Sequence, residues 1–323
     1  MYDLIIIGGG PAGITAGIYA SRKKLKTLLL TKDFVGQWGN ISEVENYPAF
    51  EKISGMELVK RFLNHLKNFE IEIKEGEEVK KIKKNNEVFE IETKKDNKFQ
   101  SRAVIVTSGR NPRPLGVPGE KDFIGRGISY CTICDAPFFK DKFAAVIGGG
   151  NAGFRAALDL IPYAKRIYIL EASPKVRADE IYQERASQAG KVEIIFNTKV
   201  LEIKGKDKAP KSPLATGVPA EGLGIGSIVY QNLISQEKKE LPIDGVFVEI
   251  GSIPATSFLN TLVDFNEMGE VKIDSKTCTT KTPGLFAAGD VTDIEYKQII
   301  IAASEGAKAA LSAYNYLQTN EQN

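Results

Sequence analysis

Five consecutive residues, Cys131-Thr132-Ile133-Cys134-Asp135, carry the clearest potential for covalent chemistry. Their spacing lets two sulfurs bond across one helical turn, and the first turn of such a helix lowers the thiol pKa. Zinc is an alternative, but a closed zinc site needs four ligands and the chain offers only Cys278 and His65 to complete one. A structural disulfide is the other alternative, which a reducing cytoplasm disfavours. We therefore predict no metal site and a cycling dithiol, with Asp135 donating or accepting a proton.

A glycine-rich motif at the N-terminus predicts one nucleotide-binding unit. The motif is Gly8-Gly9-Gly10-Pro11-Ala12-Gly13, and it stands between an apolar run and a helical stretch that precedes a second apolar run, at residues 3–7, 14–22 and 27–30. Strand, glycine turn, helix and strand in this order are typical of dinucleotide binding. Gly8 permits the tight turn, Gly10 lets a pyrophosphate approach the backbone, and Gly13 lets helix and strand pack closely.

The same pattern occurs a second time in the middle of the chain. Gly148-Gly149-Gly150-Asn151-Ala152-Gly153 lies between similar segments, namely a strand, a helix and a second strand at residues 143–147, 154–163 and 166–170. Glu171 ends that second strand, where an acidic side chain can accept hydrogen bonds from ribose hydroxyls or can simply be solvated. Two copies imply two nucleotides, and the usual reason to hold two is to pass electrons between them.

The remaining segments complete a mixed α/β pattern. A loop and helix occupy residues 42–66, hairpin strands residues 71–106, and a helix residues 298–317. Residues 205–226 are rich in Gly, Pro and Lys, so we expect a mobile hairpin extension. The apolar run 284–288 is closed by Gly289 and Asp290, whose carboxylate can bind the hydroxyls of a polyol such as the ribityl chain of a flavin.

Length and charge limit the functions that this chain can have. Its 323 residues are enough for two domains, because single cores stop growing at roughly 250–300 residues. With 43 basic and 41 acidic side chains, the formal net charge of +2 argues against nucleic-acid or anionic-membrane binding. No apolar run of about 18 residues and no signal-peptide pattern occurs, so we expect a soluble, cytoplasmic protein.

The order of these motifs resembles the low-molecular-weight thioredoxin reductase family over essentially the whole chain. Four short motifs add to the likeness: Gly36-Gln37, Glu45-Asn46-Tyr47-Pro48, Thr107-Ser108-Gly109 and Val117-Pro118-Gly119-Glu120. The resemblance implies an α/β fold with two Rossmann-like, three-layer nucleotide-binding domains, the second inserted into the first. It places an FAD-binding domain in residues 1–116 and 251–323, and an NAD(P)H-binding domain that contains the dithiol in residues 117–250.

The resemblance also implies the roles of particular residues. Cys134 is the thiolate that faces the flavin, Cys131 attacks the partner's disulfide, and Asp135 is the acid. A rotation of the inserted domain about two hinge strands would let nicotinamide and disulfide take turns at the flavin. The expected FAD contacts are Gly8, Gly10, Pro11, Ala12, Gly13, Asp33, Gly36, Gln37, Asn46, Gly109, Gly289, Asp290 and Gln298. The expected nicotinamide nucleotide contacts are Gly148, Gly150, Asn151, Ala152, Gly153 and Glu171.

Within the family, the sequence is more similar to the reductase part of the alkyl hydroperoxide reductase flavoprotein. This likeness lies in residues 170–174, 178–179, 296–302 and 305–309. NADPH-using members carry a His-Arg-Arg cluster where this chain has Glu171-Ala172-Ser173, so we expect NADH, with NADPH the less favoured coenzyme. That flavoprotein begins with a thioredoxin-like extension, whereas this sequence begins at the flavin strand.

We therefore expect a homodimer that reduces a separate thioredoxin-like or glutaredoxin-like carrier, which could feed a peroxiredoxin. The alternatives are an ordinary NADPH-dependent thioredoxin reductase, a flavin NADH oxidase and a redox-sensing flavoprotein.

Overall fold

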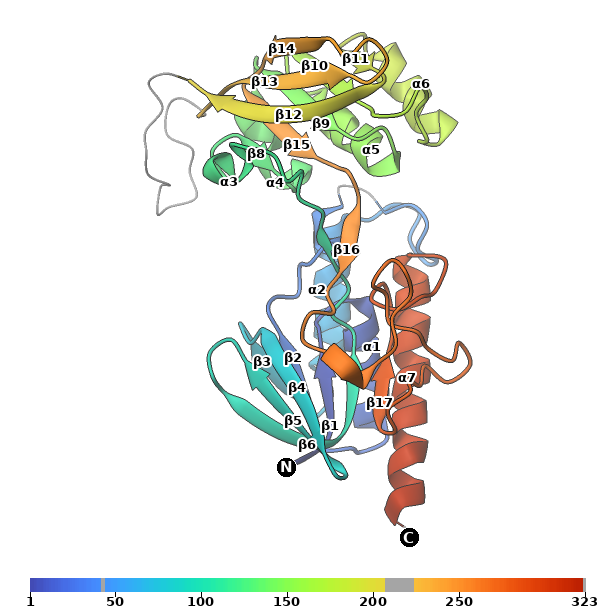
Figure 1. The fold of residues 1–323 in the computed structure, drawn as a ribbon. Helices are drawn as coiled ribbons and strands as arrows, with labels where there is room; N and C mark the ends of the chain where they lie inside the picture. Colours follow the sequence, from blue (N-terminus) through green and yellow to red (C-terminus); the bar gives the residue numbers. More distant parts are fainter. Residues whose placement is uncertain (42–43, 207–223, 322–323) are drawn as a thin grey trace. The chain divides into compact units, whose positions relative to one another are not determined.

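The computed structural model describes residues 1–41, 44–206 and 224–321 and divides into two compact units (Figure 1). Unit 1 comprises Met1–Asn111 and Ile253–Asn323, and unit 2 comprises Pro112–Ser252. Where the chain passes between them, strands β7 (Arg110–Pro112) and β16 (Ser252–Pro254) pair with each other. The sequence placed the junctions after residues 116 and 250, whereas the units divide after residues 111 and 252.

Unit 1 is built on a seven-stranded sheet. Five strands are parallel, in the order β3 (Glu72–Glu75), β2 (Thr27–Thr31), β1 (Tyr2–Ile7), β6 (Lys98–Val106) and β17 (Leu285–Ala287). The N-terminal half of β6 continues into an antiparallel meander with β5 (Val88–Thr93) and β4 (Val79–Asn85). The carboxyl ends of the parallel strands therefore share one edge of the sheet, which is where such folds bind nucleotides.

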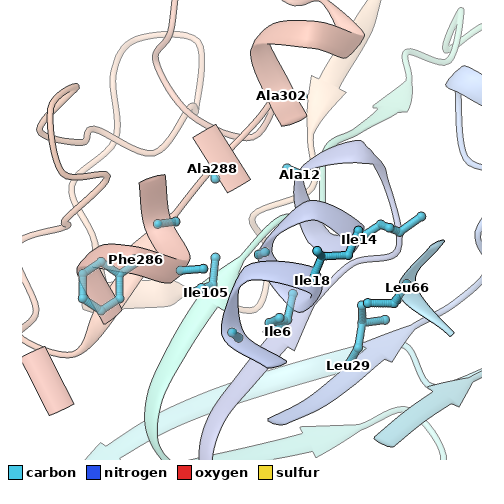
Figure 2. Close-up of a cluster of buried hydrophobic side chains, with 14 of the residues drawn as sticks. Ile6, Ala12, Ile14, Ile18, Leu29, Leu66, Ile105, Phe286, Ala288 and Ala302 are labelled. Carbon is cyan, nitrogen blue, oxygen red and sulfur yellow. The ribbon is translucent and has the colours of Figure 1, made fainter. Parts of the chain in front are cut away.

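Both faces of this sheet are buried, which explains the uninterrupted apolar runs in its central strands. Successive residues of β1 alternate between two cores, with Leu4 and Ile6 in one and Ile5 and Ile7 in the other. Figure 2 shows the first core, which the sheet shares with helices α1 (Pro11–Arg22), α2 (Gly55–Leu66) and α7 (Ile299–Glu321). The second core includes residues of the meander and of the segment before the short helix η3 (Asn260–Leu262).

Unit 2 repeats the parallel arrangement with five strands. Their order is β11 (Val192–Ile195), β10 (Arg166–Leu170), β9 (Phe143–Ile147), β15 (Gly245–Val248) and β8 (Ile128–Ser129). Connections from β9 lead to β10 on one side, while β15 lies on the other side, so the strand order changes direction between β9 and β15. A crevice at such a switch point is the usual place for a nucleotide in this fold class.

Helices and a second sheet cover the two faces of that parallel sheet. One core contains residues of α5 (Asn151–Leu160) and α6 (Glu180–Gln188), and the other contains the antiparallel strands β12 (Thr198–Gly205), β13 (Ile225–Asn232) and β14 (Lys238–Pro242). Strands β12 and β13 pair with each other, and most of the expected mobile extension between them, residues 207–223, lies outside the described residues. The short helices of unit 2 are α3 (Glu120–Phe123), α4 (Thr132–Asp135) and η2 (Ala136–Phe139).

Candidate functional site

The glycine turn of unit 1 leaves open space at the start of α1. Gly8 has a φ of +117°, and a Cβ there would lie 2.2 Å from the carbonyl oxygen of Thr107. A Cβ on Gly13 would lie 1.9 Å from the oxygen of Gly8, so both positions require glycine. Gly10, in contrast, has no atom within 4 Å of the position of its missing Cβ. Because α1 begins at Pro11, the unbonded amides of its first turn face this space, which fits an anionic pyrophosphate.

Unit 2 contains the same turn at the start of α5. Gly148 has a φ of +115°, and its Cβ would lie 2.4 Å from the oxygen of Glu249. A Cβ on Gly153 would lie 1.9 Å from the oxygen of Gly148, and the space in front of Gly150 is again open. Asn151, the first residue of α5, is held by hydrogen bonds in both directions with Asp179. The two units therefore offer two similar phosphate cradles.

The strand that follows each turn ends differently in the two units. Leu30 and Leu170 accept hydrogen bonds from Gly8 and Gly148, so Thr31 and Glu171 occupy equivalent positions. Glu171 is buried, and its two carboxylate oxygens accept from the amides of Gly149 at 2.6 Å and Ser173 at 2.8 Å. Although burial opposes ionisation, these donors hold the pKa of Glu171 below its ordinary value. The carboxylate thus lies beside the glycine turn, and its remaining lone pairs can accept from a ribose.

Asp33, one of the expected FAD contacts, is engaged in a local turn. Its Oδ1 accepts from the amide of Gly36 at 2.8 Å, and its carbonyl accepts from the hydroxyl of Thr31 at 2.6 Å. Thr31, not Asp33, is therefore the residue at the end of β2.

The C-terminal Gly-Asp pair lies against the N-terminal glycine motif. Gly289 has a φ of +78°, its missing Cβ would lie 3.1 Å from the Cβ of Ala12, and its amide donates to buried Glu305 at 2.9 Å. Burial raises the pKa of Asp290, while the charges of Lys297 and Arg110 act in the opposite direction. This carboxyl group therefore stands in a shielded position at the same edge of the sheet as the first phosphate cradle.

The remaining expected flavin contacts belong to the same unit. Asn46 donates from Nδ2 to the amide oxygen of Gln298 at 3.0 Å, and Gln37 donates to the carbonyl of Arg110 at 2.7 Å. Gly109 has a φ of +64° with open space around its missing Cβ.

Sequence reasoning missed an ion-pair network beside these residues. Glu270 is almost fully buried, and its Oε1 lies 2.6 Å from Arg110 and 3.1 Å from Lys297. Charges this distant in sequence meet only through the fold, so no local pattern could have revealed the network.

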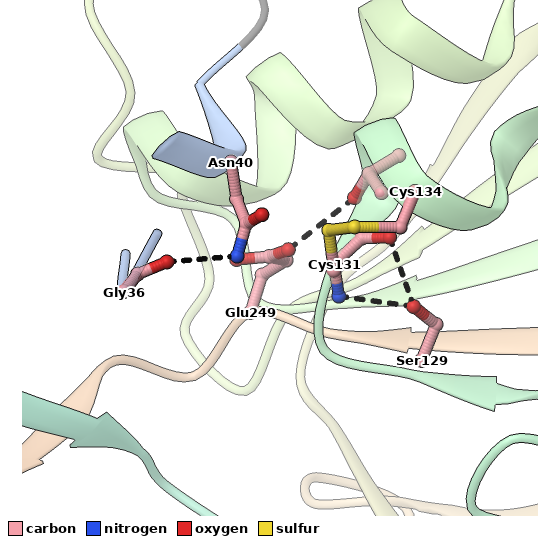
Figure 3. The surroundings of a disulfide bond; sticks show 7 residues. Gly36, Asn40, Ser129, Cys131, Cys134 and Glu249 are labelled. Carbon is pink, nitrogen blue, oxygen red and sulfur yellow. Dashed lines mark hydrogen bonds between the residues drawn. A yellow bond between two sulfur atoms is a disulfide. The ribbon is translucent and has the colours of Figure 1, made fainter. Parts of the chain in front are cut away.

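The dithiol is oxidised and lies at the start of a very short helix in unit 2 (Figure 3). Cys131 caps α4, and its backbone amide and carbonyl both bond the hydroxyl of Ser129, at 2.9 Å and 3.0 Å. Cys134 is exposed and Cys131 half-buried, while Asp135 ends the helix. Because α4 is one turn long, stabilisation of a thiolate would come from its first-turn amides.

Comparison with known proteins identifies the family. The pyridine nucleotide-disulphide oxidoreductase family model matches residues 2–306. The chain belongs to this family. It is 37% identical over 319 residues to a component of the alkyl hydroperoxide reductase of Escherichia coli, covering 98% of this chain and 58% of that protein. A protein named NADH dehydrogenase from Bacillus subtilis is 36% identical over 99% of this chain and 59% of its own length. The chain thus spans less than two thirds of these curated relatives.

Solved thioredoxin reductases match this disulphide oxidoreductase over their full length. The Lactococcus lactis enzyme is 36% identical, with a TM-score of 0.89 and coverage of 99% of this chain and 100% of that one. The enzyme from T. acidophilum is 37% identical, with a TM-score of 0.84 and coverage of 97% and 98%. These matches confirm the family resemblance, the fold class and the enzyme class, a flavoprotein oxidoreductase, that the sequence predicted.

Two further carboxyl groups of this oxidoreductase surround the dithiol segment, and neither was expected. Glu120 is buried in unit 2 and accepts from the amides of Leu115 and Gly116, each at 2.7 Å, and from the hydroxyl of Tyr130. Burial opposes the ionisation of Glu120, but these donors lower its pKa. Burial, and then the hydrogen bond to Glu120, raise the pKa of Tyr130. The second group is Glu249, which follows β15 and accepts from Thr132 at 3.4 Å.

Cys278 stands apart from this chemistry. It is fully buried in unit 1, its thiol donates weakly to the carbonyl of Glu305, and burial raises its pKa to about 12. It therefore behaves as a small buried hydrophobic residue. In the described parts of the chain, no three His, Cys, Asp or Glu side chains gather as a metal site would require, and no described helix is long and apolar enough to cross a membrane.

Proposed function

We propose that this chain transfers two electrons from NADH, through FAD and the Cys131–Cys134 pair, to a disulfide in a small thioredoxin-like or glutaredoxin-like protein. The observation that carries this proposal is the redox-competent disulfide in a unit that also contains one of two matching phosphate cradles. A chain with two cradles can hold a donor and a relay, and a disulfide beside one of them supplies the acceptor.

Unit 1 is the proposed FAD domain. Its cradle in front of Gly10 would take the pyrophosphate, and Asp290 would accept hydrogen bonds from the ribityl hydroxyls, as its shielded position beside Ala12 and Gly289 favours. Asn46 and Gln298 would offer amide groups nearby. When bound, the flavin supplies two-electron transfer between a nicotinamide and a disulfide.

Unit 2 is the proposed nicotinamide nucleotide domain. Gly150 leaves room for the pyrophosphate at the start of α5, and Glu171 would accept from the ribose hydroxyls. An ionised Glu171 repels a 2'-phosphate, which favours NADH, and two curated relatives carry the name NADH dehydrogenase. One observation favours NADPH instead: the charge of Arg177 acts on Glu171, and the amide of Arg177 donates to the carbonyl of Gly149.

The two cysteines exchange electrons with the partner by thiol–disulfide chemistry. One thiolate, assigned to Cys131, attacks a sulfur of the partner's disulfide and forms a mixed disulfide, and the released partner sulfur takes a proton from Asp135. Cys134 then attacks Cys131 and gives up its thiol proton to the second partner sulfur, which restores the internal disulfide and releases the reduced partner with both sulfurs protonated. Two electrons leave the pair for each partner disulfide opened.

The test combines turnover with direct labelling. NADH is added without oxygen to the FAD-loaded protein, and thiols are then alkylated and located by mass spectrometry. We expect label on Cys131 and Cys134 and none on buried Cys278, together with NADH oxidation that accelerates when a disulfide protein is supplied. NADH oxidation that needs oxygen and ignores every disulfide would replace the proposal with the oxidase alternative.

A further inference from the structure

Glu249 lies beside the second phosphate cradle, but the proposed function gives it no role. It directly follows β15, and its amide donates to the carbonyl of Ile147 at 2.9 Å. Its own carbonyl lies against Gly148, where a Cβ would come within 2.4 Å. The backbone of Glu249 is thus fixed at the switch point between β9 and β15, where neither strand could shift without disturbing the glycine turn.

The side chain of Glu249 is tied to the dithiol helix. Its Oε1 accepts a hydrogen bond from the hydroxyl of Thr132 at 3.4 Å. Thr132 is buried, is the first residue of α4, and stands between Cys131 and Cys134 in the chain. Figure 3 shows Glu249 together with the disulfide and Ser129. A single hydrogen bond therefore joins a carboxyl group to one of the two residues between the cysteines.

Burial and the nearby charges together determine the pKa of Glu249. Helix α5 presents Arg155, whose charge lowers the pKa of Glu249, and Asp159, whose charge raises it. The acidic residue of α4 is Asp135, at the end of that helix. The neighbouring strands β9 and β15 contribute apolar residues only. Burial raises the pKa of Glu249 to about 7.

We propose that Glu249 is a positioning residue that takes up a proton when the Cys131–Cys134 disulfide is reduced, acting through Thr132. This inference rests on the proposed cycling of the dithiol. Reduction by a dithiol reagent breaks the Cys131–Cys134 bond, forms the reagent's cyclic disulfide and moves two hydrogens to the cysteines. One cysteine thiol then ionises and releases a proton. The carboxylate of Glu249 binds one proton in response, because two negative charges on one short helix and its neighbour repel each other.

The test measures the dithiol–disulfide equilibrium of the FAD-loaded protein against reduced and oxidised dithiothreitol. The fraction reduced is read by alkylation of Cys131 and Cys134, with no nicotinamide present. Ionised Glu249 opposes thiolate formation, so the equilibrium constant for reduction should rise less with pH in the unmodified protein than in Glu249→Gln. Suppose that Glu249 and the cysteine thiol each raise the other's pKa by about one unit. The equilibrium constant for reduction of Glu249→Gln, divided by that of the unmodified protein, should then grow roughly fivefold between about pH 6 and about pH 8.

Variants of Thr132 test the route by which Glu249 acts. Thr132→Val removes the hydroxyl with little change of shape and should reproduce the pH dependence of Glu249→Gln, whereas Thr132→Ser should restore that of the unmodified protein. If Glu249→Gln does not fold, these two variants are sufficient to test the inference. Parallel pH curves for all of these proteins, or a divergence that appears only in Asp135→Asn, would overturn the inference.

The same titration separates this inference from the proposed function. A Cys131–Cys134 pair that dithiothreitol cannot open at any pH contradicts the cycling dithiol itself, and this inference with it. A pair that opens and closes with the same pH dependence in Glu249→Gln leaves the reductase proposal intact and removes only the role of Glu249.

Discussion

Two glycines of the first motif should respond to alanine in opposite ways, although they are only three residues apart. Gly10 has an ordinary extended backbone, with φ −77° and ψ −174°, and open space around its missing Cβ. Gly10→Ala should therefore leave the flavin-free protein as stable as before, or raise its stability by about 0.4–1 kcal/mol, because alanine restricts the unfolded chain. The new methyl group would instead occupy the open space that we propose for the pyrophosphate.

Gly13→Ala should reverse this pattern. Its Cβ would lie 1.9 Å from the oxygen of Gly8, and real Cβ contacts essentially never fall below 3.0 Å. Forcing the helix away from the strand should cost about 1–3 kcal/mol. At about 2–4 °C per kcal/mol for a domain of this size, Tm of the flavin-free protein should fall by roughly 2–12 °C.

The assay is a Tm measurement on flavin-free protein followed by titration with FAD. In Gly10→Ala the steric cost of about 1–3 kcal/mol would arise only when FAD is bound. We therefore expect the Kd for FAD to rise roughly 5- to 150-fold. Gly150→Ala and Gly153→Ala are the matched pair in unit 2 and should act on nicotinamide nucleotide affinity in the same way. Undiminished FAD binding by Gly10→Ala would refute the assignment of the cradle, and a normal Tm for Gly13→Ala would refute the packing argument.

Three further outcomes follow from the other site residues. The ratio of kcat/KM should favour NADH over NADPH by at least about tenfold, since a 2'-phosphate about 5 Å from Glu171 is repelled by roughly 3 kcal/mol per charge, of which about half survives screening. Glu171→Arg should shrink that ratio, and equal use by the unmodified protein would contradict the NADH assignment. Cys131→Ser and Cys134→Ser should each abolish NADH oxidation that depends on a disulfide protein, whereas Cys278→Ser should retain it; turnover by either of the first two would exclude the dithiol as the conduit. Glu120→Gln should lower the free energy of unfolding at neutral pH, and because the folded pKa of Glu120 lies below its ordinary 4.5, the difference should shrink as the pH falls below that value; a constant difference in denaturant titrations would contradict this.

The parts of this molecule that sequence could predict are those encoded within a few neighbouring residues. The glycine turns, the parallel strands and the C-x-x-C pair are such parts, because each needs a fixed residue type at a fixed spacing. The two helices that follow the glycine turns begin earlier in the structure than the sequence predicted, α1 at Pro11 and α5 at Asn151, and the reason is local. The motif's last glycine lies inside the first helical turn, where its lack of a side chain permits close packing.

The parts that sequence could not predict depend on contacts between distant segments. Glu120, Glu249 and Glu270 stand in ordinary strand-end or loop patterns, and only the folded chain brings them to Tyr130, Thr132 and Arg110. The turn of the Glu171 carboxylate back onto Gly149 is equally hidden, because a strand-end acid can point to solvent, to a ligand or to its own backbone. In each case the partner is set by tertiary packing and not by spacing along the chain.

The two cradles differ most in the charge that borders them. Thr107 and Glu249 occupy equivalent positions, since each donates its amide to the preceding β1 or β9 carbonyl and lies against the first glycine of the turn. In unit 1 both strand-end side chains are threonines, Thr31 and Thr107, whose hydroxyls bond backbone carbonyls and carry no charge. In unit 2 both positions are glutamates. A dinucleotide carries negative phosphates, so the same backbone turn bordered by carboxyl groups attracts those phosphates less strongly. That difference suits the proposed assignment, in which the nucleotide of unit 1 stays bound through turnover and the nucleotide of unit 2 has to leave after each electron pair.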